Sequence, residues 1–202
     1  MKVVHSLMIA LAVMLAACGE KPPKLPKLAA TDVVVAFGDS LTYGTGAHES
    51  ESYPAVLGRL IERTVVRAGV PGETSAQGLA GLPAVLDEHN PRLVIVCLGG
   101  NDMLRQVREA EITQNLRSII KTLKDRKIAV VLIGVPRPAL ITSAPVFYAE
   151  LAKEFAIPYE GTVVTSVLYS SETRSDPIHP NARGYRQMAE AIAQLLKNAG
   201  AI

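Results

Sequence analysis

The chain has 202 residues and a formal net charge of +2, and 49% of its residues are hydrophobic while only 4% are aromatic. This length and balance are typical of one ordinary globular domain. Lys and Arg form no block and are not interleaved with aromatic residues, so we expect no nucleic-acid partner, because phosphate neutralisation needs a clustered positive field.

Residues 1–17 have the pattern of a signal peptide. Lys2 is followed by an apolar run over residues 3–17, and a run of about fifteen residues is shorter than the ~20 that a simple transmembrane helix needs. The run ends in a Leu-Ala-Ala-Cys sequence that closes with Cys18 and resembles the lipobox of bacterial lipoproteins. We therefore expect a lipid anchor at Cys18. An ordinary signal peptide followed by a chance cysteine is the alternative.

Residues 18–31 are predicted to be the acylated cysteine and a tether. Prolines alternate with lysines over residues 20–28, and proline-rich chain favours an extended conformation that would hold a domain about 30 Å from a bilayer. In the lipoproteins that this N-terminus resembles, an Asp directly after the cysteine favours inner-membrane retention. Gly19 stands at that position here, so the resemblance implies an outer-membrane anchor that faces the periplasm.

From residue 32 onward, predicted strands and helices alternate. Four apolar, β-branched runs predict strands, and four segments with helical spacing predict helices. The strands are expected at residues 32–37, 64–68, 93–98 and 128–134, and the helices at residues 53–63, 75–89, 109–125 and 182–198. Since parallel strands need helix-sized connections, this order predicts one α/β domain over residues 32–202 with a central parallel sheet. Long loops are expected at residues 135–145 and 170–180.

A serine, a histidine and an aspartate form the candidate catalytic set. Ser40 follows the first predicted strand directly, and a serine hydroxyl becomes a good nucleophile only when a base takes its proton. His179 is the candidate base, because Asp176 lies three residues earlier and can accept its Nδ1 proton on a tight turn. Flanking prolines would stiffen that turn. Such an Asp and His spacing alone is common in solvated loops, so its weight comes from the motifs that accompany it.

Four short motifs, in order, resemble those of the SGNH, or GDSL, hydrolase superfamily over about residues 32–198. They are Gly38-Asp39-Ser40-Leu41, the segment around Gly72, Gly99-Gly100-Asn101-Asp102, and Asp176-Pro177-Ile178-His179. The sequence is most similar to the bacterial branch of arylesterases and periplasmic thioesterase/lysophospholipases. The resemblance implies a flavodoxin-like three-layer α/β/α sandwich.

The resemblance also implies an oxyanion hole. Its donors would be the backbone N–H groups of Ser40 and Gly72 and the side-chain amide of Asn101, because fixed neutral donors stabilise the negative charge that develops on the ester oxygen. Taken singly, Gly72 could merely permit a turn and Asn101 could merely cap a helix. Their joint occurrence at strand ends favours the catalytic interpretation.

The remaining candidate side chains are interpreted as structural. Asp39 and Asp102 are expected to hold loops through backbone hydrogen bonds. We expect His48 and His89 on the surface and Cys97 in a buried strand. No spacing typical of metal ligands occurs, so no metal and no organic cofactor is implied.

The predicted reaction is a two-step acyl transfer from an ester or thioester through Ser40. Short acyl and aryl esters are the first expectation, and a segment containing Ala139, Leu140 and Ile141 could either line an acyl site or simply pack a loop. The alternative interpretations are a lysophospholipase, an envelope carbohydrate O-deacetylase, and a non-catalytic lipoprotein binding module on the same fold. The complete motif set argues against the last of these. A monomer is expected.

Overall fold

The computed structural model describes residues 22–137 and 143–202, and the structural statements below concern these ranges. Five parallel strands form one sheet in the order β2-β1-β3-β4-β5. The strands are β1 (Val33–Gly38), β2 (Thr64–Gly69), β3 (Leu93–Cys97), β4 (Ala129–Ile133) and β5 (Tyr159–Glu160). The predicted α/β fold with a central parallel sheet is confirmed.

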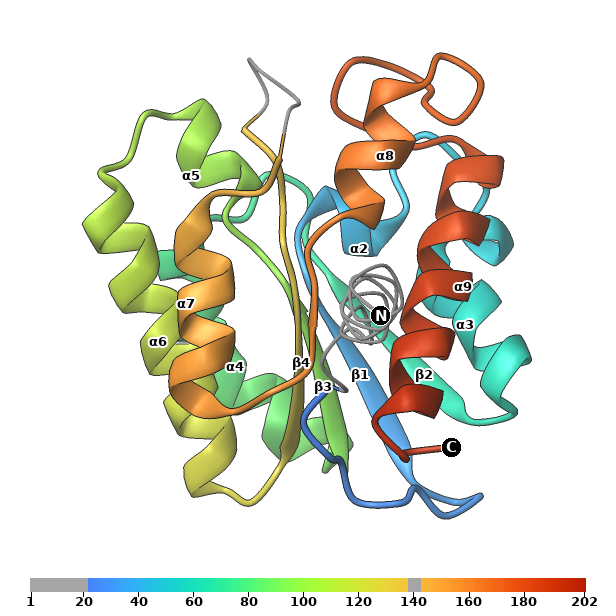
Figure 1. Ribbon diagram of the computed structural model, residues 1–202, viewed down its shortest axis with the longest axis vertical. Coiled ribbons are helices and arrows are strands. Elements are labelled where there is room, and N and C mark those ends of the chain that lie inside the picture. The colour runs from blue at the N-terminus through green and yellow to red at the C-terminus, as the bar shows by residue number, and fades with distance from the viewer. Residues whose placement is uncertain (1–21, 138–142) are drawn as a thin grey trace, which may run out of the picture.

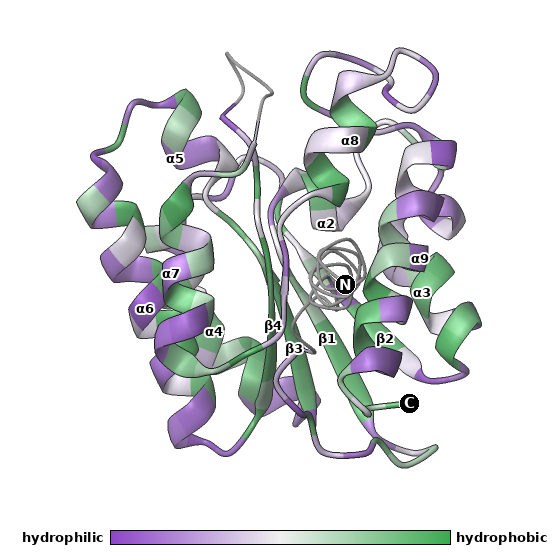
Figure 2. Cartoon of the chain, viewed as in Figure 1, coloured by the Kyte–Doolittle hydropathy of each residue, from purple (hydrophilic) through white to green (hydrophobic). Residues whose placement is uncertain are grey.

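Helices cover both faces of the sheet, which completes the three-layer arrangement (Figure 1). On one face α3 and α9 pack together, and α4, α6 and α7 lie on the other. Their bounds are α3 (Tyr53–Ile61), α9 (Ala182–Asn198), α4 (Ser75–His89), α6 (Glu109–Asp125) and α7 (Val146–Phe155). Figure 2 shows apolar residues concentrated on the strands, as expected for a sheet that is buried on both faces.

Several elements were not predicted from the sequence. Ser40 begins the short helix α2 (Ser40–Tyr43), and a second short helix, α5 (Gly100–Leu104), follows β3. The segment before the C-terminal loop contains α7, β5 and α8 (Val163–Tyr169). β-Branched residues dominate α8, but their packing against α9 outweighs their weak intrinsic preference for strands.

The second half of the predicted tether belongs to the folded domain. The backbone N–H of Leu25 donates to the carbonyl of Ala199 at 2.9 Å, and that of Leu28 donates to Ala201 at 2.8 Å. The side chain of Leu28 is buried in the hydrophobic core. This finding corrects the expected 18–31 tether. The alternating prolines and lysines around the two leucines, with Pro26 and Lys27 between them, masked their apolar spacing. The chain from residue 22 onward thus builds a continuous core of its own.

The predicted signal peptide at residues 1–17 and the predicted acylated Cys18 lie outside the described residues. Within the described ranges, no helix is both long enough and apolar enough to span a bilayer.

Candidate active site

Ser40 occupies the first position of α2, directly beyond the carboxyl end of β1. Asp39 is the N-cap of this helix, and its Oδ1 accepts the backbone N–H of Leu41 at 3.0 Å. The hydroxyl of Ser40 therefore stands at the edge of the sheet where ligands of open α/β folds bind. Ser40 is half-buried, so its hydroxyl is fixed by the fold and still accessible.

The loop before α9 forms the tight turn that the sequence predicted. Oδ1 of Asp176 accepts the backbone N–H groups of Ile178 and His179, both at 2.9 Å. Oδ2 of Asp176 lies 2.8 Å from Nδ1 of His179. An antiparallel bridge between Arg174 and Pro180 closes the loop. The carboxylate therefore fixes both the backbone of the turn and the plane of the imidazole.

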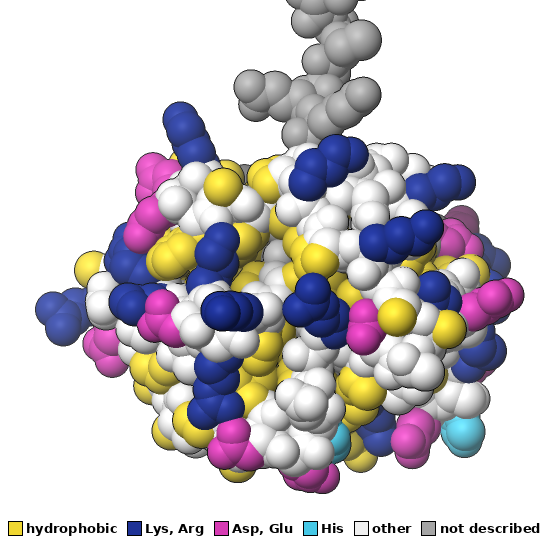
Figure 3. All heavy atoms as spheres, turned by 90° about the horizontal axis from the view of Figure 1, so that it is seen from below, with side chains coloured by type: hydrophobic (Ala, Val, Ile, Leu, Met, Phe, Trp, Pro, Cys, Tyr) yellow, Lys and Arg dark blue, Asp and Glu magenta, His cyan; other side chains and the backbone are white. Residues whose placement is uncertain are grey.

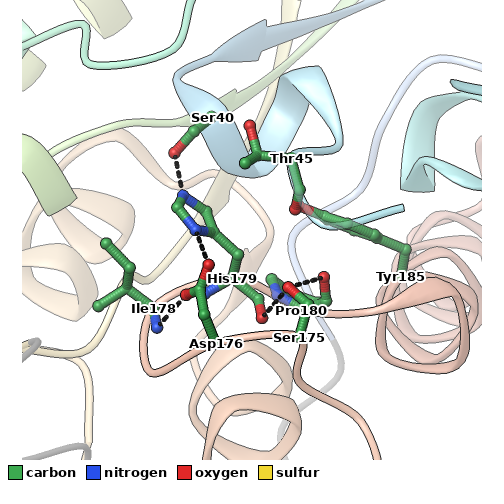
Figure 4. Close-up of polar contacts among 8 residues, drawn as sticks. All are labelled: Ser40, Thr45, Ser175, Asp176, Ile178, His179, Pro180 and Tyr185. Carbon is green, nitrogen blue, oxygen red and sulfur yellow. Dashed lines mark hydrogen bonds and ion pairs between the residues drawn. The ribbon is translucent and has the colours of Figure 1, made fainter. Parts of the chain in front are cut away.

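The structure brings Ser40, His179 and Asp176 into one hydrogen-bonded chain. Nε2 of His179 lies 3.0 Å from Oγ of Ser40, and Figure 4 shows the imidazole ring between the hydroxyl and the carboxylate. The side chain of His179 is 16% exposed, whereas that of Asp176 is 44% exposed. To the side of these residues in Figure 4, the hydroxyl of Tyr185 in α9 donates to the carbonyl of Thr45 at 2.7 Å. This bond ties the segment after α2 to the helix that follows the histidine loop.

The ionisation of Asp176 suits it to orient a histidine. Partial burial raises its pKa, but the hydrogen bonds from the Ile178 backbone and from His179 outweigh that effect, so the pKa of Asp176 is below its usual value. An ionised carboxylate can only accept hydrogen bonds. It therefore holds the Nδ1 proton toward itself and leaves Nε2 facing Ser40.

A cavity of about 230 Å³ opens beside Ser40 and His179. Gly72 and Asn101 line the same cavity, so the structure gathers all of the predicted site residues of the folded domain. The rest of its wall is largely apolar, and its apolar side chains are Leu41, Pro71, Leu104, Val135, Pro136, Leu168 and Ile178. The predicted acyl wall of Ala139, Leu140 and Ile141 lies outside the described residues.

The side-chain amide of Asn101 is already engaged by the protein. Its Nδ2 donates to the backbone carbonyl of Glu73 at 3.0 Å and to Oδ2 of Asp39 at 3.3 Å. Gly72 has a φ of +82°, and its carbonyl accepts from the Arg105 guanidinium at 2.9 Å. Sequence reasoning missed the parts played by Glu73 and Arg105, because no motif links residues that meet only in the folded chain.

Asp39 and Asp102 have the structural roles that were expected of them. Burial raises the pKa of Asp39 to about 7, because the charge of Glu73 adds to desolvation and the Leu41 N–H offsets only part of the rise. The carboxylate of Asp102 accepts both the backbone N–H and the hydroxyl of Ser75, at 2.8 and 2.7 Å. Asp102 thereby joins the start of α5 to the start of α4.

The other histidines and the cysteine of the folded domain lie away from the cavity. His48 caps an exposed 3₁₀ turn, and His89 is a half-buried residue at the end of α4 next to Glu88. Cys97 is buried in β3. Across the two described ranges, no group of three or more His, Cys, Asp or Glu side chains is placed to hold a metal ion.

Comparisons with known proteins identify the family of the chain. The model of the GDSL-like lipase/acylhydrolase family matches residues 36–187. Thioesterase 1/protease 1/lysophospholipase L1 of Escherichia coli K12 is 35% identical over 179 residues, which cover 85% of this chain and 86% of that protein. An arylesterase of Vibrio mimicus is 32% identical over 178 residues, which cover 83% and 89% of the two chains.

Solved structures show the same arrangement of the chain. The crystal structure of TesA superposes with a TM-score of 0.73 and 28% identity, over 83% of this chain and 99% of that one. The SGNH-hydrolase family esterase AlinE4 gives a TM-score of 0.65 with 33% identity, over 86% and 98% of the chains. The chain therefore belongs to the GDSL-like lipase/acylhydrolase family and is a hydrolase of ester bonds.

Proposed function

We propose that this protein hydrolyses carboxylic esters or thioesters through an acyl-enzyme on Ser40. The observation that supports the proposal most strongly is the hydrogen-bonded chain from Asp176 through His179 to Ser40 at the mouth of a small cavity. His179 takes the hydroxyl proton as Ser40 attacks the carbonyl carbon, and then protonates the leaving alcohol or thiol. Water, activated by the same histidine, releases the acid and restores Ser40.

The proposed oxyanion donors are the backbone N–H groups of Ser40 and Gly72 and the Nδ2 of Asn101. The longer of the two Asn101 contacts, to Asp39, is the one that the developing oxyanion would replace. A protonated Asp39 accepts hydrogen bonds less strongly than an ionised one, and the raised pKa of Asp39 eases this exchange near neutral pH. Removal of one such donor costs about 3 to 4 kcal/mol of transition-state stabilisation in comparable enzymes.

Hydrolysis of p-nitrophenyl esters by the wild type and by Ser40→Ala tests the proposal. We expect the wild type to be active and Ser40→Ala to lose activity by at least about 10³-fold, since the acyl-enzyme cannot form. Ser50→Ala changes an exposed serine that is outside the cavity lining, so it is the matched control and should retain activity. Full activity in Ser40→Ala would exclude the mechanism.

The size of the cavity favours short acyl groups and aryl esters as substrates. A volume of about 230 Å³ is below the range of roughly 300 to 1,000 Å³ that is usual for sites of drug-sized ligands. The same observation makes acetyl esters of envelope carbohydrates a second candidate substrate. Hydrolysis of a p-nitrophenyl ester series from acetyl to palmitoyl, measured beside hydrolysis of an acetylated oligosaccharide, distinguishes short-chain esterase and deacetylase activity from lysophospholipase activity.

The location of the enzyme is also a proposal. The Leu-Ala-Ala-Cys sequence supports acylation of Cys18 and an outer-membrane anchor that faces the periplasm. Labelled palmitate should enter the wild type and should be absent from Cys18→Ser. Membrane fractionation of the two forms tests whether the protein is in the outer membrane.

We also propose that the protein is a monomer in solution, and light scattering tests this oligomeric state.

A further inference from the structure

The pole of the molecule opposite the cavity carries basic side chains that the proposed reaction does not use. The cavity lies at the carboxyl ends of the strands, and this pole is formed by the amino ends and the loops that precede them (Figure 1). Figure 3 views the molecule from this end and shows several Lys and Arg side chains on it, with Asp and Glu side chains mostly toward its edges. We call this surface the basic pole, and it comprises Lys24, Lys27, Arg92, Lys124, Arg126 and Lys127, all of which are exposed.

Most of these cations have no acidic partner. Arg126 is paired with Asp87 at 2.6 Å. Within the described part of the chain, the other five cations of the basic pole have no carboxylate within 4.0 Å. Clustered charge of one sign raises the local potential and attracts anions. Apart from Arg126, the cations of the basic pole therefore carry charge that no ion pair among the described residues compensates.

The fold, and not a run of sequence, assembles this surface. Lys24, Arg92, Lys124 and Lys127 line one cavity of about 240 Å³. They come from the segment before β1, from the loop before β3, and from the end of α6 with the turn after it. These cations come from three separate segments, so they form no Lys and Arg block in the sequence. The sequence alone therefore did not indicate the cluster.

The neighbouring groove extends the same surface. It has a volume of about 810 Å³ and shares Arg92 and Lys127 with the smaller cavity. Its acidic side chains are already occupied, since Asp87 pairs with Arg126 and Asp32 accepts the backbone N–H of Ala29 at 2.7 Å. The cavity and the groove thus offer the charges of Lys24, Arg92 and Lys127, while Lys124 also donates to the carbonyl of Phe155 at 3.1 Å and the carboxylates of the groove are held by the protein.

We propose that the basic pole docks on the anionic phospholipid headgroups of a membrane surface. The chain itself favours this partner, because the segment that follows the predicted lipid anchor at Cys18 joins the fold here, through the backbone bonds of Leu25 and Leu28. Only the few residues between Cys18 and Leu25 separate an anchored lipid from the basic pole. Docking in this orientation turns the cavity beside Ser40 away from the bilayer, toward substrates in the aqueous phase. The docking does not depend on the proposed hydrolysis.

Sedimentation with lipid vesicles tests the docking on the chain from residue 22 onward, which contains the folded core and lacks the predicted anchor. We expect binding to vesicles of phosphatidylglycerol and phosphatidylcholine at low ionic strength, and little binding to phosphatidylcholine alone. Replacement of Lys24, Arg92 and Lys127 by Gln should weaken binding on the order of 100-fold, since each cation near an anionic surface contributes roughly a fivefold factor. Thermal unfolding followed by circular dichroism verifies that the variant is folded.

A second variant separates location from net charge. It replaces Arg108, Arg183 and Arg186, three exposed arginines outside the basic pole, by Gln. This control should bind within a few-fold of the wild type. An equal loss in both variants, equal binding to neutral vesicles, or full displacement by millimolar inorganic phosphate at constant ionic strength would each overturn membrane docking.

The orientation has its own measurement. Cys97 is buried, so a cysteine introduced at an exposed position can be labelled selectively. A polarity-sensitive dye on Lys127→Cys should shift to the blue on anionic vesicles, whereas the same dye on Tyr169→Cys should not. Tyr169 is 79% exposed and follows Leu168, which lines the cavity. A blue shift at residue 169 alone would show that the cavity mouth faces the membrane and would overturn the proposed orientation.

Discussion

Nε2 of His179 lies 3.0 Å from Oγ of Ser40, although 139 residues separate them in the sequence. The contact joins the carboxyl end of β1 to the loop before α9, and α9 is held in place by packing against α3 and by the Tyr185 bond to Thr45. The alignment of hydroxyl and imidazole therefore depends on the sheet and on the helices on one of its faces. Small changes in the β1–α2 segment or in the loop before α9 should lower the catalytic rate.

Replacing Asp176 by Asn should separate catalysis from stability. The amide can no longer favour the imidazole tautomer with its proton on Nδ1, so kcat for an aryl ester should fall by about 10³ to 10⁴. Because the side chain of Asp176 is 44% exposed, the melting temperature should change little. Steady-state kinetics measures kcat, and thermal unfolding measures the melting temperature. Glu172 lies on the same loop as Asp176, and its exposed carboxylate pairs with Arg183 of α9. The control Glu172→Gln removes only this ion pair, so its kcat should equal that of the wild type. An Asp176→Asn enzyme with wild-type kcat would contradict the proposed role.

Gly38→Ala should disturb the position of Ser40. A Cβ at residue 38 would lie 2.3 Å from both the carbonyl oxygen of Cys97 and Oγ1 of Thr42, so β1 or α2 must move. We expect kcat/KM to fall by at least tenfold and the free energy of unfolding to fall by about 1 to 3 kcal/mol. Gly81→Ala in α4 is the matched control. Its new Cβ meets nothing within 4 Å, so this variant should be as active as the wild type and stabilised by up to about 1 kcal/mol.

The stability of the protein should depend on pH through Asp39. Its pKa is raised from 3.8 to about 7, so the folded state binds this proton more tightly than the unfolded state does. The resulting stabilisation is complete below the unfolded pKa and is lost as the pH rises toward 7. Urea unfolding at pH 5 and pH 8 should show about 2 to 3 kcal/mol more loss in the wild type than in Asp39→Asn, which does not titrate there. Equal losses in the two proteins would show that Asp39 ionises normally.

The centre of the sheet was predictable because β1, β3 and β4 are apolar on both faces, whereas the two-residue edge strand β5 was not predicted. Runs such as residues 93–98 have no polar side to expose, so they indicate buried parallel strands, and the structure places β3 there. The two short segments that contain Ser40 and Asp176 were predictable for a related reason. Ser40 follows a strand end directly, and Asp176 and His179 are only three residues apart. In both segments, local spacing along the chain determines the geometry.

Contacts between distant segments could not be predicted in this way. The bond from Asn101 to Asp39 spans 62 residues, and it depends on how β1 and β3 lie side by side. The helix α8 was hidden by its β-branched residues, whose helical conformation is stabilised only by tertiary packing. The docking of Leu25 and Leu28 was hidden by Pro26 between them and by the two prolines that precede them.

The chain-length preference should respond to Leu168. This side chain is 4% exposed and lines the cavity, so Leu168→Ala should lengthen the space available to an acyl chain. We expect the ratio of kcat/KM for octanoyl over acetyl p-nitrophenyl esters to rise at least about fivefold, because each methylene that gains apolar burial contributes roughly 0.8 kcal/mol. The variant should also lose about 2 to 5 kcal/mol of stability through the cavity it creates.

Val167→Ala distinguishes a specific effect on the cavity from general loosening of α8. Val167 is fully buried in the same helix, but its side chain is absent from the lining of the described cavity. This control should lose stability while its octanoyl to acetyl ratio stays at the wild-type value. If the ratio rises equally in both variants, the preference is set by the rigidity of α8. If it rises only in Leu168→Ala, the apolar wall beside Ser40 selects the acyl chain by its size.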